Sequence, residues 1–288
     1  MQPTRTLTAH CTLSHPADGQ PLLTIDNQHA KAEISLFGAH VLSYQRHGEP
    51  ASIWLSDKAV LDGSKPIRGG IPLCWPWFGP SPARVGSGKP AHGFARISLW
   101  TLDGVSDHGD GTLVHLSLRD TDASRALWPH PFELELDVLV GKELSLVLTT
   151  RNTGKTPLTY NAALHTYLQI SRPEAVQVTG LGEPYHDKLT GRDAQQQGAL
   201  TLSAAMDRIY NQPDPMVSVQ DRDRTTRVVS GNHDSVVVWN PWAEGAAAMA
   251  DMSNDGYRTM LCVEAAITAD AGVTVAPDEE HSFSTVII

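Results

Sequence analysis

Apolar and polar residues alternate along three stretches in the middle of the chain, and this alternation is typical of β-strands with one buried face. The stretches are TLVHLSL at 112–118, FELELDVLV at 132–140 and ELSLVLTT at 143–150. Gly141 and Lys142 separate the second stretch from the third, which predicts a hairpin turn. We therefore expect antiparallel strands in this region.

Other apolar runs predict strands along the rest of the chain. They cover residues 23–27, 32–44, 235–240, 259–266 and 281–288. Helical patterns are limited to residues 123–128 and part of 203–210, which disfavours a repeating βαβ fold. Turn clusters separate the strands without any break in composition. We predict an all-β protein with one domain over residues 1–288.

The segment Ile67–Phe94 is rich in Gly and Pro and is the longest region without a strand pattern, and such loops often carry functional sites. In it, Arg68 precedes two glycines, which allow close backbone approach, and Trp75, Trp77 and Phe78 stand among prolines. An arginine and aromatic faces suit a sugar pocket. A structural loop whose arginine pairs with a carboxylate is an equal alternative.

Composition and charge exclude several classes of function. The 288 residues include 22 Lys or Arg and 32 Asp or Glu, a formal net charge of −10, which argues against a general nucleic-acid-binding surface. The three cysteines form no CxxC pair and are too few for a disulfide scaffold, which favours a reducing compartment. No apolar stretch is long enough to cross a bilayer or to form a signal peptide. We expect a cytoplasmic protein that binds neither nucleic acid nor membrane.

Two histidines and an arginine have functional and structural interpretations. In PAHGFAR, His92 and Arg96 flank a Gly-Phe turn that we expect to lead into a strand, with a surface arginine as the alternative. His165 lies in the apolar run 161–170, where its imidazole must be hydrogen-bonded or used in chemistry. A hydrogen-bonded core histidine is the alternative there.

Two acidic residues have the same ambiguity. Glu264 falls inside a predicted buried strand, where a carboxylate costs free energy unless it is paired or hydrogen-bonded, so a buried structural ion pair is its alternative. Asp207 stands next to Arg208, and a surface ion pair between these neighbours is the default interpretation. The chain has no HExxH, no GxSxG and no zinc-type Cys/His spacing, so we expect no metal or other cofactor.

Six motifs together carry a family resemblance. They are IRGGIPLCWPWFG, PAHGFAR, LHTYL, DRIY, VWNPW and CVEA. In order and spacing they resemble the glucose-6-phosphate 1-epimerase (hexose-6-phosphate mutarotase) family, from about Trp54 to the C-terminus. The resemblance implies the galactose mutarotase-like fold, a large antiparallel β-supersandwich with an open substrate cleft. It also implies an isomerase that interconverts the α and β anomers of a hexose 6-phosphate, with glucose 6-phosphate as the first choice.

The resemblance assigns roles to six positions, two catalytic and four that bind or line the substrate site. The catalytic pair is His165 and Glu264, and the other positions are Arg68, His92, Arg96 and Asp207. We predict that ionised Glu264 removes the C1 hydroxyl proton while protonated His165 donates to the ring oxygen O5. Asp207 is expected to hold sugar hydroxyls and to favour the charged imidazole. Arg68 and Arg96 are expected to clamp the phosphate dianion.

One position departs from the family pattern, because some members have glutamine where this chain has Ala91. A substrate contact is then missing, and Lys89 is a candidate substitute. The main alternative function is an aldose 1-epimerase acting on free hexoses, which Arg96 disfavours. A non-catalytic sugar-phosphate-binding protein is disfavoured by the presence of both His165 and Glu264, and a glycosidase needs two carboxylates across the scissile bond. We expect the protein to be a monomer.

Overall fold

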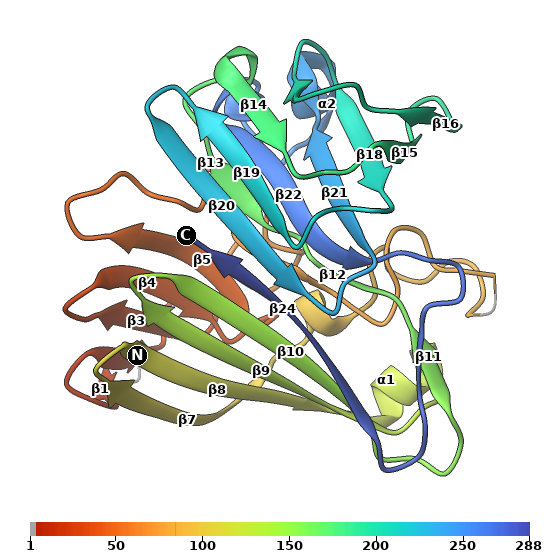
Figure 1. The fold of residues 1–288 in the computed structure, drawn as a ribbon. Helices are drawn as coiled ribbons and strands as arrows, with labels where there is room; N and C mark the ends of the chain where they lie inside the picture. The colour runs from red at the N-terminus through yellow and green to blue at the C-terminus, as the bar shows by residue number, and fades with distance from the viewer. Residues whose placement is uncertain (1–3, 84) are drawn as a thin grey trace.

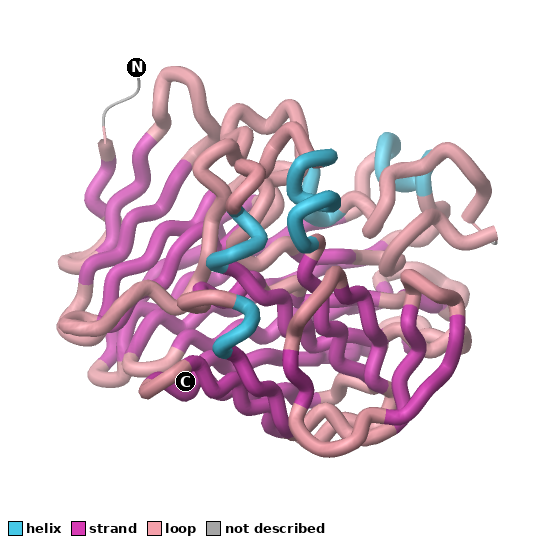
Figure 2. The backbone as a smooth tube through the Cα atoms, turned by 90° about the horizontal axis from the view of Figure 1, so that it is seen from above, coloured by secondary structure: helices cyan, strands magenta, loops and turns pink. Residues whose placement is uncertain are grey.

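β-Strands dominate the fold, loops and turns join most of them, and the helical segments are short (Figures 1 and 2). The computed structural model describes residues 4–83 and 85–288. The described strands form a five-stranded, a nine-stranded, an eight-stranded and a two-stranded sheet, and neighbouring strands within the sheets pair antiparallel. The all-β prediction is therefore confirmed, with large antiparallel sheets as its main components.

The nine-stranded sheet contains the three stretches with the clearest alternation. Its strand order is β17-β14-β19-β20-β24-β10-β9-β8-β7. The bounds are β7 (Thr101–His108), β8 (Gly111–Arg119), β9 (Phe132–Gly141), β10 (Leu144–Asn152), β14 (Val176–Thr179), β17 (Leu200–Thr201), β19 (Met216–Asp221), β20 (Arg224–Gly231) and β24 (Glu280–Ile287). Strands β9 and β10 form the predicted hairpin, with Leu146 opposite Val138.

The eight-stranded sheet runs in the order β16-β15-β18-β21-β22-β12-β6, with β13 also paired to β22. Its bounds are β6 (Leu73–Cys74), β12 (Ala162–Leu164), β13 (Tyr167–Gln169), β15 (Pro184–Asp187), β16 (Arg192–Gln195), β18 (Met206–Tyr210), β21 (Ser235–Asn240) and β22 (Met260–Ile267). All eight residues of β22 are buried, and strands pair with both of its edges.

Two smaller sheets and a few short helical segments complete the fold. The five-stranded sheet is β1 (Arg5–Thr6), β2 (Cys11–Ser14), β3 (Leu22–Asp26), β4 (Ala30–Ser35) and β5 (His40–Arg46), and β11 (Leu158–Tyr160) pairs with β23 (Val273–Val275). The helical segments are α1 (Asp122–Leu127), α2 (Trp242–Ala248), η1 (Ala95–Ile97), η2 (Pro173–Ala175) and η3 (Gly256–Thr259). None of the helices in the described ranges has the length and hydropathy to span a membrane.

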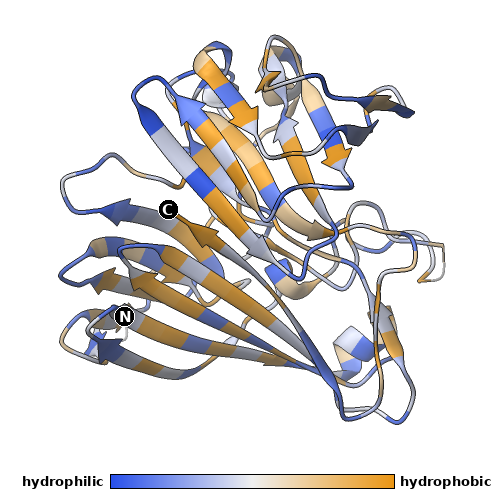
Figure 3. Cartoon of the chain, viewed as in Figure 1, coloured by the Kyte–Doolittle hydropathy of each residue, from blue (hydrophilic) through white to orange (hydrophobic). Residues whose placement is uncertain are grey.

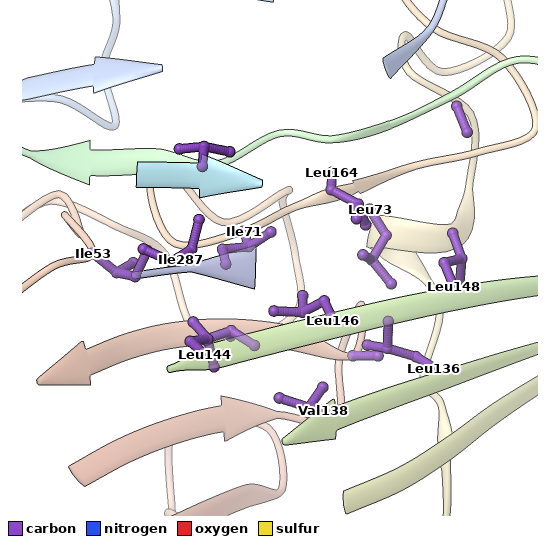
Figure 4. Close-up of a cluster of buried hydrophobic side chains, with 14 of the residues drawn as sticks. Ile53, Ile71, Leu73, Leu136, Val138, Leu144, Leu146, Leu148, Leu164 and Ile287 are labelled. Atoms are coloured by element: carbon purple, nitrogen blue, oxygen red, sulfur yellow. The ribbon is translucent and has the colours of Figure 1, made fainter. Parts of the chain in front are cut away.

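The core lies where apolar faces of the sheets meet. Along the strands, apolar and polar positions alternate as the sequence predicts (Figure 3). In Figure 4, side chains of β9, β10 and β24 face those of β6 and β12 across this core. The labelled examples are Leu136, Val138, Leu144, Leu146, Leu148, Ile287, Leu73 and Leu164. The predicted helix at 123–128 is confirmed as α1, which begins with a capping box between Thr121 and Ser124.

Three local predictions are wrong. The single run 32–44 is divided into β4 and β5 by a turn in which Gly38 and Ala39 have positive φ. The segment 203–210 ends in strand β18 instead of a helix, because β15 and β21 pair with both of its edges. The turn in PAHGFAR leads into η1 instead of a strand. In each case tertiary pairing or turn geometry overrides a weak local pattern.

Candidate active site

A polar cavity of about 230 Å³ lies against the eight-stranded sheet, over strands β18, β21 and β22. It is lined by Arg68, Phe78, His92, Arg96, His165, Lys188, Asp207, Val237, Trp239 and Glu264. The structure thus brings together in one cavity all six residues that the sequence singles out. Lys188, Val237 and Trp239 are additional lining residues that the sequence analysis did not identify.

The sheet holds three of the lining side chains at the floor of the cavity. Glu264 lies in the middle of β22, where its Cα pairs with that of Val237 on β21. Asp207 lies on β18, next to β21. His165 lies between β12 and β13, and its backbone N–H donates to the Pro72 carbonyl at 3.0 Å. Paired strands thus carry Glu264 and Asp207, which fixes the positions of these two residues on the cavity floor.

Two glycines that follow Arg68 let the backbone approach strand β5 of the five-stranded sheet closely. Gly69 and Gly70 both have positive φ, and a Cβ on Gly70 would lie 2.3 Å from the Val41 carbonyl oxygen. The carbonyl of Gly69 accepts a 2.7 Å hydrogen bond from Nε2 of His40, which is fully buried. Burial lowers the pKa of His40 to about 4, so this ring is neutral at pH 7. The sequence expectation that these glycines permit close backbone approach is confirmed.

His92 presents a hydrogen-bond donor to the cavity. The backbone N–H of Gly79 donates to Nδ1 of His92 at 3.2 Å, and the His92 N–H donates to the Gly79 carbonyl at 2.6 Å. Burial, followed by the charges of Arg96, Lys188 and Arg68, lowers the His92 pKa to about 3. A neutral imidazole whose Nδ1 accepts must carry its hydrogen on Nε2. His92 therefore acts as a neutral Nε2–H donor.

His165 and Glu264 face each other beneath this donor. Nε2 of His165 lies 3.4 Å from Oε1 of Glu264, and the two side chains are 12% and 1% exposed. The His165 ring stacks on Tyr167 at 5.0 Å and meets His92 edge-on at 5.8 Å. Nδ1 of His165 and Oε2 of Glu264 are both buried without a hydrogen-bond partner among the described residues. Such atoms are costly in a stable core, which favours a functional role over the structural alternatives.

Burial shifts the two members of this pair in opposite directions. It lowers the pKa of His165, helped by the nearby His92, Arg96 and Arg68. It raises the pKa of Glu264, and the carboxylate of Asp207 raises it further. Both effects favour a neutral imidazole beside a protonated carboxyl group. The expectation that Asp207 promotes a charged imidazole is therefore wrong, because Asp207 acts on the pKa of Glu264 instead.

The two arginines are held in different ways. Nε of Arg68 donates to Oδ1 of Asp251 at 3.2 Å, and its Nη1 donates to the Tyr167 hydroxyl at 3.1 Å. Arg96 donates from Nη2 to the Ala91 carbonyl at 2.9 Å, and its Nε is buried without a hydrogen-bond partner among the described residues. Arg68 is thus neutralised by a carboxylate, whereas Arg96 is bound to a carbonyl group and has no carboxylate partner among the residues that the structure describes.

Asp207 pairs with Lys188 and not with its neighbour in sequence. Nζ of Lys188 donates to Oδ2 of Asp207 at 2.9 Å, and the Lys188 N–H donates to the Asp207 carbonyl at 2.8 Å. Lys188 also lies 5.3 Å from the centroid of the Phe78 ring. Arg208 pairs with Asp187 instead, so the expected Asp207–Arg208 surface pair is absent from the described structure. No sequence motif marked Lys188, because a hairpin turn brings it to Asp207.

The aromatic side chains are distributed differently from the sequence expectation. Trp75 and Trp77 are fully buried in the core, and only Phe78 of that loop reaches the cavity. Trp239, within the VWNPW motif, supplies the second aromatic wall. Lys89 does not replace the family glutamine, because its Nζ donates to the Leu127 carbonyl and it lines a separate cavity of about 510 Å³.

Three side chains could hold a metal ion. One donor atom each from His165, Cys262 and Glu264 lies within 4.8 Å of the other two. Nitrogen, sulfur and carboxylate oxygen are the donors that Zn²⁺ prefers. No spacing rule could predict this set, because β22 and the β12–β13 connection bring its members together only in the folded chain. All three cysteines are buried free thiols, in agreement with the absence of a disulfide scaffold.

Comparisons with known proteins agree with the fold. The profile of the aldose 1-epimerase family matches residues 21–287. A protein of Escherichia coli K12 that is provisionally named glucose-6-phosphate 1-epimerase is 36% identical over 259 residues, 88% of this chain and 85% of its own. The crystal structure of a provisionally named mutarotase from Salmonella typhimurium superimposes with a TM-score of 0.93 and 32% identity, covering 99% of this chain and 95% of that one. A galactose 1-epimerase from Lactobacillus acidophilus shares the fold, with a TM-score of 0.72, 14% identity and coverage of 98% of both chains.

Proposed function

The chain belongs to the aldose 1-epimerase family, and from this membership and the cavity we propose that it interconverts the α and β anomers of a hexose 6-phosphate, with glucose 6-phosphate as the preferred substrate. One observation carries the proposal. A histidine and a glutamate, His165 and Glu264, face each other at 3.4 Å on the floor of a cavity lined by three cationic side chains. The names of the relatives in Escherichia coli and Salmonella typhimurium support the phosphorylated substrate.

Anomers interconvert when the C1 hydroxyl loses a proton, the C1–O5 bond breaks and O5 gains a proton. Ionised Glu264 removes the C1 hydroxyl proton, and protonated His165 donates to O5. The ring opens to an aldehyde, the C1–C2 bond rotates, and the ring closes on the other face of C1 with the proton transfers reversed. One proton moves from O1 to O5 overall, so no oxidant or reductant takes part.

The buried pair carries one proton between its two members. Burial favours neutral His165 with protonated Glu264, and transfer of that proton within the pair gives the imidazolium and carboxylate that ring opening uses. Ring opening then returns the pair to neutral imidazole and protonated carboxyl. The protonation state that burial favours is therefore the one that accompanies the open-chain aldehyde.

The remaining lining residues orient the sugar. The Nε2–H of His92 lies on the His165 side of the cavity and is placed to donate to O5 or its neighbours. Asp207 accepts from sugar hydroxyls, while Arg96 and Arg68, which is fixed by Asp251 and Tyr167, donate to the phosphate group. Trp239 packs against the apolar C–H face of the ring, as aromatic side chains do in sugar sites.

Two-dimensional NMR exchange spectroscopy of glucose 6-phosphate anomers tests the proposal, with glucose, galactose and an enzyme-free sample alongside. We expect the exchange rate of the phosphosugar to rise far above the spontaneous rate. Glu264→Gln and His165→Asn each remove one proton-transfer group, which costs about 10²- to 10⁴-fold in kcat. Near-normal turnover in either variant would refute the assigned pair, and acceleration of free sugars alone would favour an epimerase of unphosphorylated hexoses.

A further inference from the structure

The ring of His165 lacks the hydrogen bond that usually orients a histidine in an active site. Its Nδ1 is buried without a hydrogen-bond partner among the described residues, and its Nε2 lies 3.4 Å from Oε1 of Glu264. In many sites a carbonyl or carboxylate group binds the second ring nitrogen and fixes both the tautomer and the ring plane. Rotation of an imidazole about its Cβ–Cγ bond has broad minima, so the ring does not hold its own orientation. Another contact must fix the plane of His165.

The face of the Tyr167 ring supplies this contact. The planes of the His165 and Tyr167 rings are 15° apart, and their centroids are 5.0 Å apart. Both residues belong to the LHTYL motif, and the proton transfers proposed above use only its histidine. A stacked ring restricts rotation of the imidazole without binding either nitrogen. Stacking therefore fixes the ring plane and leaves Nε2 able to take up and release a proton.

Tyr167 is itself held from several sides. Its side chain is 2% exposed, and its backbone pairs with Cys262 of β22. The Trp54 ring stacks on it with centroids 5.8 Å apart and planes 19° apart, and the Trp54 Nε1–H donates to Oγ1 of Thr259 at 3.0 Å. The Tyr167 hydroxyl accepts a hydrogen bond of 3.1 Å from Nη1 of Arg68. A side chain fixed by packing and hydrogen bonding is a rigid support for a functional group.

Two other rings contact His165 edge-on. Trp239 lies 6.1 Å from it, with ring planes 74° apart, and His92 lies 5.8 Å from it, with ring planes 71° apart. Both of these residues line the cavity, whereas Tyr167 does not. Among the described residues, Tyr167 is thus the ring that His165 contacts face-on, and it supports the imidazole from within the protein.

We infer that Tyr167 is a positioning residue for the proposed acid–base pair, because the face of its ring holds the His165 imidazole in the plane that directs Nε2 towards Glu264 and the sugar. This inference rests on the proposed function and deepens it. The role belongs to the aromatic ring and not to the hydroxyl group. The hydroxyl group supports Arg68 instead, so two parts of one side chain serve two different residues of the cavity.

Tyr167→Phe and Tyr167→Leu separate these two parts. Both variants lose the hydrogen bond to Arg68, and only the leucine variant also loses the ring. We expect kcat of Tyr167→Phe to stay close to that of wild type. Misplacement of a reacting group by about 1 Å costs on the order of 10²-fold, so kcat of Tyr167→Leu should be about 10- to 100-fold below that of Tyr167→Phe. KM should be similar in the two variants, since both lack the same hydroxyl group. Equal kcat values would overturn the inference.

Tyr44→Leu controls for the loss of stability that any large-to-small substitution in the core causes. Tyr44, on β5, is 1% exposed, and its hydroxyl donates to the Gly141 carbonyl at 2.9 Å. It does not line the cavity, so kcat per folded molecule should be unchanged in Tyr44→Leu. Circular dichroism gives the folded fraction of each variant. A merely structural role of Tyr167 predicts an unchanged kcat per folded molecule in Tyr167→Leu as well, and that result would overturn the inference.

NMR spectra of wild type test the stack without any substitution that could impair folding. The ring current of Tyr167 should shift the carbon-bound ring protons of His165 upfield, and nuclear Overhauser effects should connect the two rings. Tyr167→Phe should keep the upfield shifts, and Tyr167→Leu should lose them. Random-coil shifts for the His165 ring in wild type would overturn the inference, whatever the behaviour of the variants.

The two kinds of measurement separate this inference from the proposed function. Anomer exchange by wild type, with equal kcat in Tyr167→Phe and Tyr167→Leu, would overturn the positioning role and leave the proposed function standing. An ordered His165 ring that depends on an aromatic ring at position 167, without acceleration of anomer exchange by wild type, would refute the proposed function. In that case the support of His165 by Tyr167 would still be confirmed.

Discussion

Nε2 of His165 lies 3.4 Å from Oε1 of Glu264, and burial acts on the two groups with opposite signs. It makes the imidazole a weaker base and the carboxyl a weaker acid. Each group is therefore held in its neutral form at a pH where its counterpart in the unfolded chain is charged. The pair is suited to exchange one proton with a sugar, and the same burial reduces the stability of the fold.

The first prediction concerns Glu264→Gln. The pKa of Glu264 in the folded chain is raised above its ordinary value of 4.5. The contribution of this carboxyl group to the stability of the fold is therefore complete below pH 4.5 and is lost as the pH rises towards the folded pKa. Glutamine does not ionise, so the variant does not lose stability in this way. We expect the variant to gain stability over wild type with increasing pH, by about 1.4 kcal/mol per pH unit within this window. Urea unfolding at pH 4.5, 6 and 7.5 measures it.

Glu264→Gln should thus be inactive and more stable at pH 7.5, while the two proteins should have similar stability at pH 4.5. The pH dependence of stability that arises from His165 has the opposite sign. Because its pKa is lowered, its contribution to the stability of the fold is complete above pH 6.5 and is lost at lower pH. Above pH 6.5 His165 is neutral in the folded and the unfolded chain of both proteins, so the stability difference in that range reports Glu264. A stability difference that does not vary with pH would contradict the raised pKa of Glu264.

The second prediction concerns the tautomer of His92. Gly79 donates to Nδ1, so the ring should carry its proton on Nε2 and remain neutral down to about pH 3. Nitrogen-15 chemical shifts of the imidazole should show a protonated Nε2 and an unprotonated Nδ1, unchanged from pH 8 to pH 5. His92→Phe keeps a ring but removes the donor, and kcat should fall about tenfold or more. Titration of His92 near pH 6.5 would contradict the assigned state.

The sequence predicted the strands best where one face of a strand packs on the core and the other face is less buried. Residues 112–118, 132–140 and 143–150 alternate because one face packs on the core, and all three are strands. The helix predicted within 203–210 is wrong because this segment contributes a short strand, β18, which forms by pairing with β15 and β21. Local propensity does not contain that information.

The candidate site was predictable only in part. Residues within the family motifs, such as His165 and Glu264, were identified by resemblance, and the structure places them in one cavity. Lys188 and Cys262 were missed as site residues, since neither has a motif of its own and each is defined by a contact across strands. The wrong expectation for Asp207 arose because burial, which sequence alone does not measure, dominates the His165 pKa.

The third prediction concerns the loop that carries His92. Gly93 has a φ of +71°, and a Cβ there would lie 1.9 Å from the Trp75 carbonyl oxygen, a backbone atom that cannot move alone. Gly48 has a similar φ of +78° but nothing within 4 Å of its would-be Cβ. Gly48→Ala should therefore cost only the backbone strain, about 1 kcal/mol. Gly93→Ala should cost about 3 kcal/mol or more and lower activity, because the His92 loop must shift. Urea unfolding of both variants compares these costs, and equal values would show that the loop adjusts freely.

The last prediction concerns inhibition by zinc. His165, Cys262 and Glu264 offer nitrogen, sulfur and oxygen donors within 4.8 Å of one another, and zinc binds all three kinds of donor. A bound Zn²⁺ would occupy both members of the acid–base pair, so micromolar Zn²⁺ should inhibit anomer exchange and excess EDTA should reverse the inhibition. Cys262→Ser removes the sulfur ligand without altering the proposed acid–base pair, and it should raise the half-inhibitory zinc concentration at least tenfold.

Co²⁺ gives a second readout, because a sulfur-to-cobalt charge-transfer band in the near ultraviolet should appear in wild type and not in Cys262→Ser. Equal zinc sensitivity of the two proteins, with no such band, would show that the three side chains do not act together as ligands.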